Sequence, residues 1–234
     1  MEQRTLEWYN ARLGYFTASS IADLFVSGKG TKDHPVMFGL TAQAVIREKA
    51  AERCFSKKFL QDDVFMEWWY RYNNASSKIM EFGTLQEPKA RTAYQEATGL
   101  LVKEVGFMTS CDVDWLGASP DGEVVDGELV GGIEIKNLTP HETMRVALAM
   151  SADPLALKAA NKDHFWQTQT QMSVCGYKFV DYVVYCEILE NPLFIWRQYP
   201  VAEAQAEIIE RVTEANKLAD EYQKELADKA YKGV

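Results

Sequence analysis

The stretch GASPDGEVVDGELVGGIEIKN, from Gly117 to Asn137, holds two turn signals and an apolar run with charged residues inside it. The Pro-Asp-Gly sequence around Asp121 and the Asp126-Gly127 dipeptide are both typical of turns. Short runs rich in valine and isoleucine follow each turn, at 123–126 and 131–137. The stretch therefore predicts a β-hairpin that begins at an acidic turn.

The second of these strands carries an unusual pair of charges. Side chains alternate across a strand, so Glu134 and Lys136 share one face while Ile133 and Ile135 share the other. When the two strands pair, Asp121 and Glu134 can converge on one point. Two carboxylates and a backbone carbonyl form the oxygen site that Mg²⁺ or Mn²⁺ prefers. Lys136 could orient or deprotonate a water there, or stabilise negative charge on a phosphate. The alternative is a plain turn followed by a solvated strand face.

The size and charge of the chain limit its domain organisation and the classes of function open to it. The chain has 234 residues, of which 47% are hydrophobic, which predicts one core and a single domain over 1–234. Its formal net charge of −9 argues against a general nucleic-acid coat. A nuclease stays compatible with this charge, because it needs acidic metal ligands and only a local basic track.

The N-terminal sequence and the cysteines indicate the compartment. The opening MEQRTLEWYNARLG lacks the basic and then apolar pattern of a signal peptide, and no apolar run is long enough to span a bilayer. We therefore expect a cytoplasmic protein without membrane association. The four cysteines show no CxxC spacing, which favours reduced thiols over a zinc or iron–sulfur site.

The order of predicted elements indicates the fold class. Helical periodicity occurs in the first half of the chain, at 6–10, 17–25, 40–54, 62–72 and 80–99. Strand-forming residues concentrate later, at 100–110, 123–126, 131–137, 179–189 and 193–200. One helix is predicted among these strands, at 163–175, and a long charged helix at 202–231. This order predicts an α/β (α+β) fold, with a central mixed, twisted β-sheet flanked by helices.

Four segments together resemble a known family. The spacing of Pro-Asp and Glu-x-Lys resembles the signature of the PD-(D/E)xK nuclease superfamily. WYNARLGYFTASSIADLF, FGTLQEPKAR and HFWQTQTQMSVCG resemble the W-x₃-R-x-G-x₂-T-A-S motif, the G-x₃-E helix and the glutamine helix of one branch. That branch is the phage lambda-type alkaline exonucleases, or YqaJ-type viral recombinases. The resemblance runs from Trp8 to about Tyr185 and implies a restriction-endonuclease-like core.

The resemblance implies roles for the acidic cluster. Asp121 and Glu134 would bind the metal, and the carbonyl of Ile135 would complete its shell. Lys136 would help to position the attacking water. Glu87 would be a further acidic ligand or would hold a water. Pro88 directly follows Glu87 in an expected helix, so a kink there would displace this last carboxylate.

The glutamine helix leaves its register open. The resemblance favours Gln167 as the side chain near Lys136 and the scissile phosphate. Gln169 and Gln171 follow in the same QTQTQ run and remain candidates. A polar helix face is the alternative for all three.

Further residues match a family pocket for a terminal 5′-phosphate, namely Arg12, Ser19 and Ser119. Arginine offers a planar fork of donors, and Ser19 is expected at a helix N-terminus with free N–H groups. The alternative roles are a surface ion pair for Arg12, an N-cap for Ser19 and a turn residue for Ser119.

Met80 aligns with an apolar wedge at the duplex end, although a core methionine is equally consistent. Lys29, in a basic loop at 27–32, could reach duplex DNA or simply be solvated. The three histidines match no family position.

The resemblance implies an activity and partners. It implies an Mg²⁺-dependent 5′→3′ exonuclease, with Mn²⁺ possible, that degrades one strand of linear double-stranded DNA with a 5′-phosphate end. Mononucleotides would leave, and the remaining 3′ overhang would pass to a single-strand annealing protein for recombination. A phage or prophage origin and a homotrimeric ring around DNA are also implied.

Two other classes of function remain open. One is a structure-specific endonuclease or RecB-type nuclease of the same superfamily, which would cut closed circular DNA. The other is a non-catalytic module that binds DNA ends. Asp121, Glu134 and Lys136 together argue against the second class, since binding alone does not require three converging ionisable groups.

Overall fold

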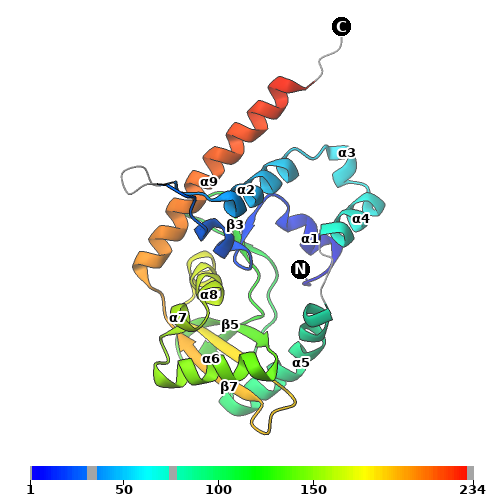
Figure 1. Ribbon diagram of the computed structural model, residues 1–234. Helices are drawn as coiled ribbons and strands as arrows, with labels where there is room; N and C mark the ends of the chain where they lie inside the picture. The colour runs from blue at the N-terminus through cyan, green and yellow to red at the C-terminus, as the bar shows by residue number, and fades with distance from the viewer. Residues whose placement is uncertain (1, 31–35, 74–77, 231–234) are drawn as a thin grey trace.

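The computed structural model describes residues 2–30, 36–73 and 78–230, with the backbone alone at 72, 73 and 78–80 (Figure 1). Its N-terminal half contains α1 (Leu6–Arg12), β1 (Phe16–Thr17), the 3₁₀ helix η1 (Ile21–Phe25), α2 (Leu40–Arg53), α3 (Lys57–Leu60), α4 (Asp63–Asn73) and α5 (Lys78–Thr98). The remainder contains β2 (Met108–Thr109), β3 (Leu116–Ala118), β4 (Gly122–Asp126), β5 (Leu129–Asn137), α6 (Pro140–Ala152), α7 (Leu157–Ala160), α8 (Lys162–Cys175), β6 (Val180–Tyr185), β7 (Leu193–Gln198) and α9 (Ala202–Lys229).

The larger sheet is mixed, as the sequence predicts. Its strand order is β4-β5-β6-β7, with β5 and β6 parallel and the outer pairs antiparallel. The predicted hairpin is confirmed: Asp126 pairs with Leu129, and Gly127 takes the left-handed conformation that the turn requires, with a φ of +61°. The parallel step from β5 to β6 is made through α6, α7 and α8, which lie between these strands in the chain.

The two faces of this sheet are covered by different helices (Figure 1). Ile133 and Ile135 pack with Tyr94 of α5 on one face. On the other face, Tyr182 belongs to the core that includes Trp166 of α8. Because neighbouring side chains in a strand point to opposite faces, the even-numbered Glu134 and Lys136 of β5 face α8.

A second layer of helices packs against α8. A small sheet, β1-β3-β2, and the elements η1, α2 and α9 share the core on that side. The buried residues of α9 recur at helical spacing, as a stripe of Ala204, Ile208, Val212, Ala215 and Ala219. The predicted long terminal helix is therefore amphipathic and holds this layer together.

Some expected elements differ in the structure. The α-helix expected at 17–25 is wrong, because Thr17 pairs with Gly117 in a parallel bridge and only η1 follows. The strand expected at 100–110 is reduced to β2 and to a single bridge between Lys103 and Glu123. Helix α6 was not expected, although Thr139 caps it through its side chain and Pro140 occupies its first turn.

Helix α5 runs without interruption through Pro88 and ends before Gly99, whose φ is +73°. Pro88 therefore does not end this helix, and Glu87 lies within it. Across the part of the chain that the structure describes, no helix combines the length and the apolar character that crossing a membrane requires.

Candidate active site

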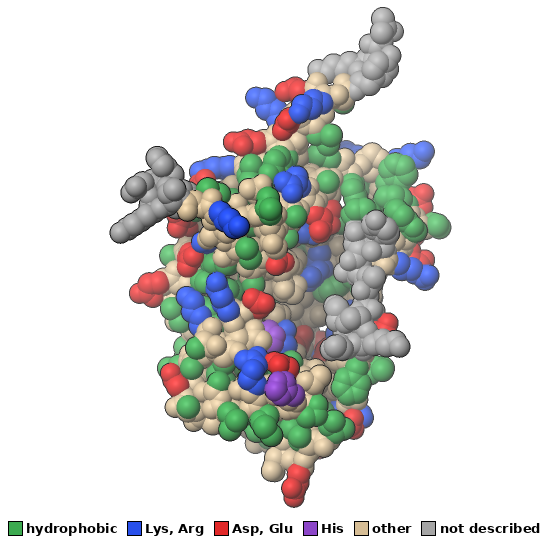
Figure 2. Space-filling model, in the orientation of Figure 1, with side chains coloured by type: hydrophobic (Ala, Val, Ile, Leu, Met, Phe, Trp, Pro, Cys, Tyr) green, Lys and Arg blue, Asp and Glu red, His purple; other side chains and the backbone are tan. Residues whose placement is uncertain are grey.

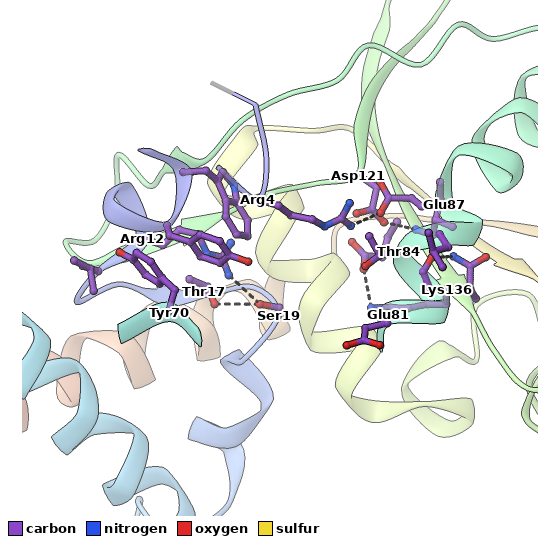
Figure 3. A pocket seen from close by; sticks show the side chains of 18 of the residues that line it. Arg4, Arg12, Thr17, Ser19, Tyr70, Glu81, Thr84, Glu87, Asp121 and Lys136 are labelled. Carbon is purple, nitrogen blue, oxygen red and sulfur yellow. Dashed lines mark hydrogen bonds and ion pairs between the residues drawn. The ribbon is translucent and has the colours of Figure 1, made fainter. Parts of the chain in front are cut away.

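A cavity of about 940 Å³ lies between the larger sheet and the N-terminal helices. Figure 2 shows this face of the molecule hollowed near its centre, with acidic and basic side chains interspersed around it. In Figure 3, Asp121, Glu87 and Lys136 lie at one end, and Arg12, Thr17, Ser19 and Tyr70 lie at the other. The structure thus brings the predicted acidic cluster and part of the predicted phosphate pocket into one cavity.

Asp121 is held across the hairpin at the start of β4. Its N–H donates to the Ile133 carbonyl at 3.1 Å, and its Oδ2 accepts from the Ile135 N–H at 2.7 Å. Burial raises the pKa of Asp121 well above its ordinary value, and the negative charges of Glu134 and Glu87 add to this effect. Such crowding of carboxylates indicates a place for a cation.

Lys136 links the second carboxylate to α8. Its Nζ lies 2.8 Å from Glu134 Oε1 and donates to Gln167 Oε1 at 2.9 Å. Burial lowers the pKa of this ammonium, but the charge of Glu134 and their hydrogen bond outweigh burial, so the pKa is raised. In this arrangement Lys136 is a charged donor at neutral pH.

The glutamine run presents two of its members to the site. Gln167 Nε2 donates to Glu134 Oε1 at 2.7 Å, and Gln171 Nε2 donates to Glu134 Oε2. Gln169 points elsewhere: it donates to the Tyr199 carbonyl at 3.0 Å and accepts from the Val201 N–H at 2.9 Å. Residues four apart share a helix face and residues two apart do not, which explains why Gln167 and Gln171 contact Glu134 and Gln169 does not.

Glu87 enters the cavity from α5. It pairs with Arg91 at 2.9 Å, one turn along the same helix, and with Arg4. Sequence reasoning did not identify Arg4, because no motif includes it and its basic charge precedes the first helix. The signal that marks it, a positive φ, exists only in the structure.

At the other end of the cavity, serine hydroxyls accept hydrogen bonds from one guanidinium. Arg12 Nη1 donates to Ser119 Oγ at 3.0 Å, and Nη2 lies 3.5 Å from Ser19 Oγ. Trp8 contributes as well, since its Nε1 donates to Ser119 Oγ at 3.0 Å and Arg12 stacks 4.0 Å above its ring. Burial lowers the pKa of Arg12 to about 10, so this group is cationic at neutral pH. The three predicted phosphate-binding residues are therefore adjacent.

A buried carboxylate supports this end of the cavity and was also missed. Glu52 of α2 accepts from the Gly14 N–H at 2.8 Å and pairs with Lys49 at 3.1 Å. Gly14 has a φ of +77°, and a Cβ there would lie 2.7 Å from Arg53 Cγ. Gly14, two residues after Arg12, thus permits a turn that the hydrogen bond from its N–H to Glu52 stabilises.

The structure contradicts the expected helix position of Ser19 and does not place Lys29 or Met80 in the cavity. Ser19 is not at the start of an α-helix as expected: Ser20 precedes η1, and Ser19 instead bonds with Thr17 at 3.2 Å. Lys29 is exposed and is absent from the described lining of the cavity. The side chain of Met80, together with Lys32 and His34, lies outside the described residues. The DNA-binding roles given to Ser19, Lys29 and Met80 stay predictions.

The donor atoms around Asp121 and Glu134 suit a divalent ion of the Mg²⁺ type. Within the described ranges, no three His, Cys, Asp or Glu side chains form a metal-binding group. Two carboxylates, the Ile135 carbonyl and water would form the shell, and Mg²⁺ commonly keeps several waters. Gln171 Oε1 and Asn137 Oδ1 are also buried without a hydrogen-bond partner among the described residues. These residues fit such an ion.

Known proteins share this architecture. A family model described as the YqaJ-like viral recombinase domain matches residues 7–178. The crystal structure of an alkaline exonuclease (LHK-Exo) from Laribacter hongkongensis is 27% identical, with a TM-score of 0.68, and the alignment covers 97% of this chain and 100% of that one. LHK-Exo in complex with dAMP matches over the same shares of both chains, with 27% identity and a TM-score of 0.65.

A more distant structure shares the fold alone. A phage-related exonuclease from Haemophilus somnus 129PT is 15% identical, with a TM-score of 0.62, over 91% of this chain and 96% of that one. A comparison with curated proteins found no match. The predicted mixed α/β architecture is therefore that of alkaline exonucleases.

Proposed function

The chain belongs to the YqaJ-like viral recombinase family, and from this premise we propose that it is an Mg²⁺-dependent 5′→3′ exonuclease of linear double-stranded DNA. Mn²⁺ is the alternative ion. The alkaline exonuclease that matches over its whole length supports a DNA nuclease as the general activity. The ion, the polarity and the products below are the finer parts of the proposal.

One observation carries the polarity: the candidate phosphate pocket and the acidic cluster occupy the same cavity. Only Pro120 separates Ser119, which bonds Arg12, from Asp121, so the two Cα atoms are at most about 7 Å apart. A terminal 5′-phosphate bound at Arg12 and Ser119 would place the next phosphodiester near Asp121. Cleavage there releases one nucleotide, and the dAMP bound to LHK-Exo is itself a mononucleotide.

The residues of this chain would share the work of hydrolysis. Gln167 and Gln171 hold both oxygens of Glu134, which orients the carboxylate for a ligand. The Lys136 ammonium donates toward the reacting phosphate and stabilises the negative charge that develops there. Arg12 fixes the terminal phosphate, so the scissile bond is held in position for attack.

Asp121, Glu134 and the Ile135 carbonyl would hold the ion. When bound, Mg²⁺ supplies Lewis-acid activation of the phosphodiester and a nucleophilic water at neutral pH. The charge of the cavity supports this requirement, because among the described residues six carboxylates and four cationic side chains line it. A bound divalent ion would offset this excess of negative charge where the reacting phosphate lies.

We extend the proposal to the assembly and the product. The remaining 3′ overhang is the substrate of a single-strand annealing protein, which we propose as the partner in recombination. A homotrimeric ring around DNA would combine the net charge of −9 with processive binding, because acidic residues could face outward and basic residues inward. Analytical ultracentrifugation tests the ring, and a stable monomer at working concentration contradicts it.

The activity is tested with linear duplexes labelled at the 5′ or the 3′ end of one strand, with Mg²⁺ or with EDTA. We expect early release of the 5′ label only with Mg²⁺, retention of the 3′ label and no cutting of closed circles. Early release of the 3′ label would contradict the polarity. Nicking of closed circles would instead indicate an endonuclease.

Active-site variants complete this test. Asp121→Asn and Lys136→Ala should each lower kcat by at least about 100-fold, because each removes an interaction with the reacting phosphate or its ion. Lys217→Ala, on an exposed side chain of α9, removes the same charge far from the cavity and should leave kcat unchanged. Wild-type activity in either active-site variant contradicts the assignment.

A further inference from the structure

Arg4 has a backbone conformation that arginine rarely adopts. Its φ is +66°, and among the described residues Trp115 is the only other non-glycine residue with a positive φ. For residues with a Cβ this left-handed region costs free energy, and such strain concentrates at functional sites. A glycine would adopt this conformation without that cost. The arginine side chain at this position therefore calls for an explanation.

The neighbours of Arg4 hold its backbone on both sides. The Gln3 amide donates to the Val105 carbonyl at 3.0 Å and to the Pro120 carbonyl at 2.7 Å, directly before Asp121. Thr5 caps α1 by accepting from the Trp8 N–H at 3.2 Å. The strained φ is thus held between two anchors, and it determines where the side chain of Arg4 extends.

The guanidinium of Arg4 extends into the cavity between its two ends. Figure 3 shows Arg4 reaching from the side of Arg12 toward Asp121 and Glu87. Its Nη2 pairs with Glu87, but Glu87 is already paired with Arg91. The Arg91 side chain is 18% exposed, whereas that of Arg4 is 46% exposed. Arg4 is therefore the more accessible of the two partners, and an exposed ion pair of this kind stabilises little.

We propose that Arg4 is a DNA-binding residue that contacts the phosphodiester between the terminal nucleotide and the next one. This inference rests on the proposed function of the cavity. Nη2 is the Arg4 nitrogen that donates within the described residues, so its planar fork retains donors for phosphate oxygens. The contact with Glu87 keeps the guanidinium pointed into the cavity before DNA enters, which lowers the cost of ordering it.

The test measures DNA binding separately from cleavage. Anisotropy of a labelled, 5′-phosphorylated duplex in EDTA gives Kd over a range of salt concentrations for wild type, R4G and R4Q. We expect both variants to weaken binding about tenfold, and to lower the slope of log Kd against log salt by about one, as loss of one phosphate contact should. The Tm of R4G should equal or exceed that of wild type, because glycine relieves the strained φ.

Several outcomes decide between a binding and a structural role. R4G with a lower Tm and with wild-type Kd and salt slope would overturn the inference, because Arg4 would then serve only its ion pair. If R4G fails to fold, R4Q retains the side-chain length, and a wild-type slope in R4Q overturns the inference equally. K217A is the matched control and should change neither Kd nor slope. Failure of wild type to bind the duplex would instead contradict the proposed function itself.

Discussion

At the residue scale, Glu134 shows how neighbours prepare a buried carboxylate. Both of its oxygens accept hydrogen bonds from α8, from Gln167 and Gln171, and Lys136 lies 2.8 Å away. A buried carboxylate without such partners would be costly to ionise. These donors hold the side chain in one orientation, which is what binding of a cation at this position requires.

The glutamine run supplies a matched pair of variants. Gln167→Ala should lower kcat about 100-fold with the fold intact, because it releases Glu134 and Lys136. Gln169→Ala should leave kcat near wild type but lower the free energy of unfolding by about 1–3 kcal/mol, because its backbone partners at Tyr199 and Val201 lose their bonds. Single-turnover cleavage and urea unfolding measure the two effects. Equal losses of kcat in both variants would contradict this division.

At the element scale, α5 connects the sheet to the cavity. Its apolar face, including Ala90 and Tyr94, packs on β5, and the same helix presents Glu87 to the cavity. Pro88 lies inside this helix, where it cannot donate to the carbonyl four residues earlier. Helix packing on the sheet outweighs this local defect, since α5 continues for ten residues beyond it.

Replacing this proline should therefore stabilise the protein. Pro88→Ala restores a backbone donor in a helix interior and should raise the free energy of unfolding by about 1–2 kcal/mol, less than the full helix propensity difference because proline also restricts the unfolded chain. In Pro88→Ala, the ion pair with Arg91 should hold Glu87 in place, so kcat should stay within about threefold of wild type. Lys89→Ala, at an exposed position next to it, should change stability by less than about 0.5 kcal/mol. A lower stability for Pro88→Ala would show that the proline is required.

At the scale of the whole molecule, a partly buried histidine joins α8 to the sheet. His164 Nδ1 lies 2.6 Å from the Tyr182 hydroxyl, on the same face of α8 as Gln167 and Gln171. Burial lowers the pKa of His164 to about 3, and the positive charges of Lys136 and Arg145 add to this shift. The folded protein therefore keeps this imidazole neutral where an unfolded chain would protonate it.

The stability of the protein should consequently depend on pH through His164. Its contribution is fully present above pH 6.5, the ordinary value, and is lost as the pH falls toward 3, because the unfolded chain takes up the proton first. Between pH 6.5 and 5 the free energy of unfolding should fall by about 1–2 kcal/mol. Urea unfolding of His164→Gln should show a smaller fall. His141→Gln is the control, because the His141 side chain is 88% exposed, and it should behave as wild type. An equal fall in His164→Gln would contradict the assignment.

Local patterns were sufficient for much of the fold. The turn at Asp126-Gly127, the alternation along β5 and the period of α9 are short-range properties, and each appears in the structure as predicted. The α-helix expected at 17–25 does not form, because Thr17 pairs with Gly117, a residue a hundred positions away in the sequence. No local propensity reports such a contact, so tertiary structure overrode the helical pattern.

For the site, the sequence by itself was enough to predict Asp121, Glu134 and Lys136 as the residues that would carry the chemistry, because these follow from turn chemistry and strand alternation. Their convergence with Arg12 and Ser19 in one cavity, the choice of Gln167 and Gln171 over Gln169, and the roles inferred for Glu52 and Arg4 were decided by the tertiary structure. The physical reason is range. Backbone preference and periodicity act over a few residues, whereas a cavity and a strained φ are imposed by contacts between distant segments.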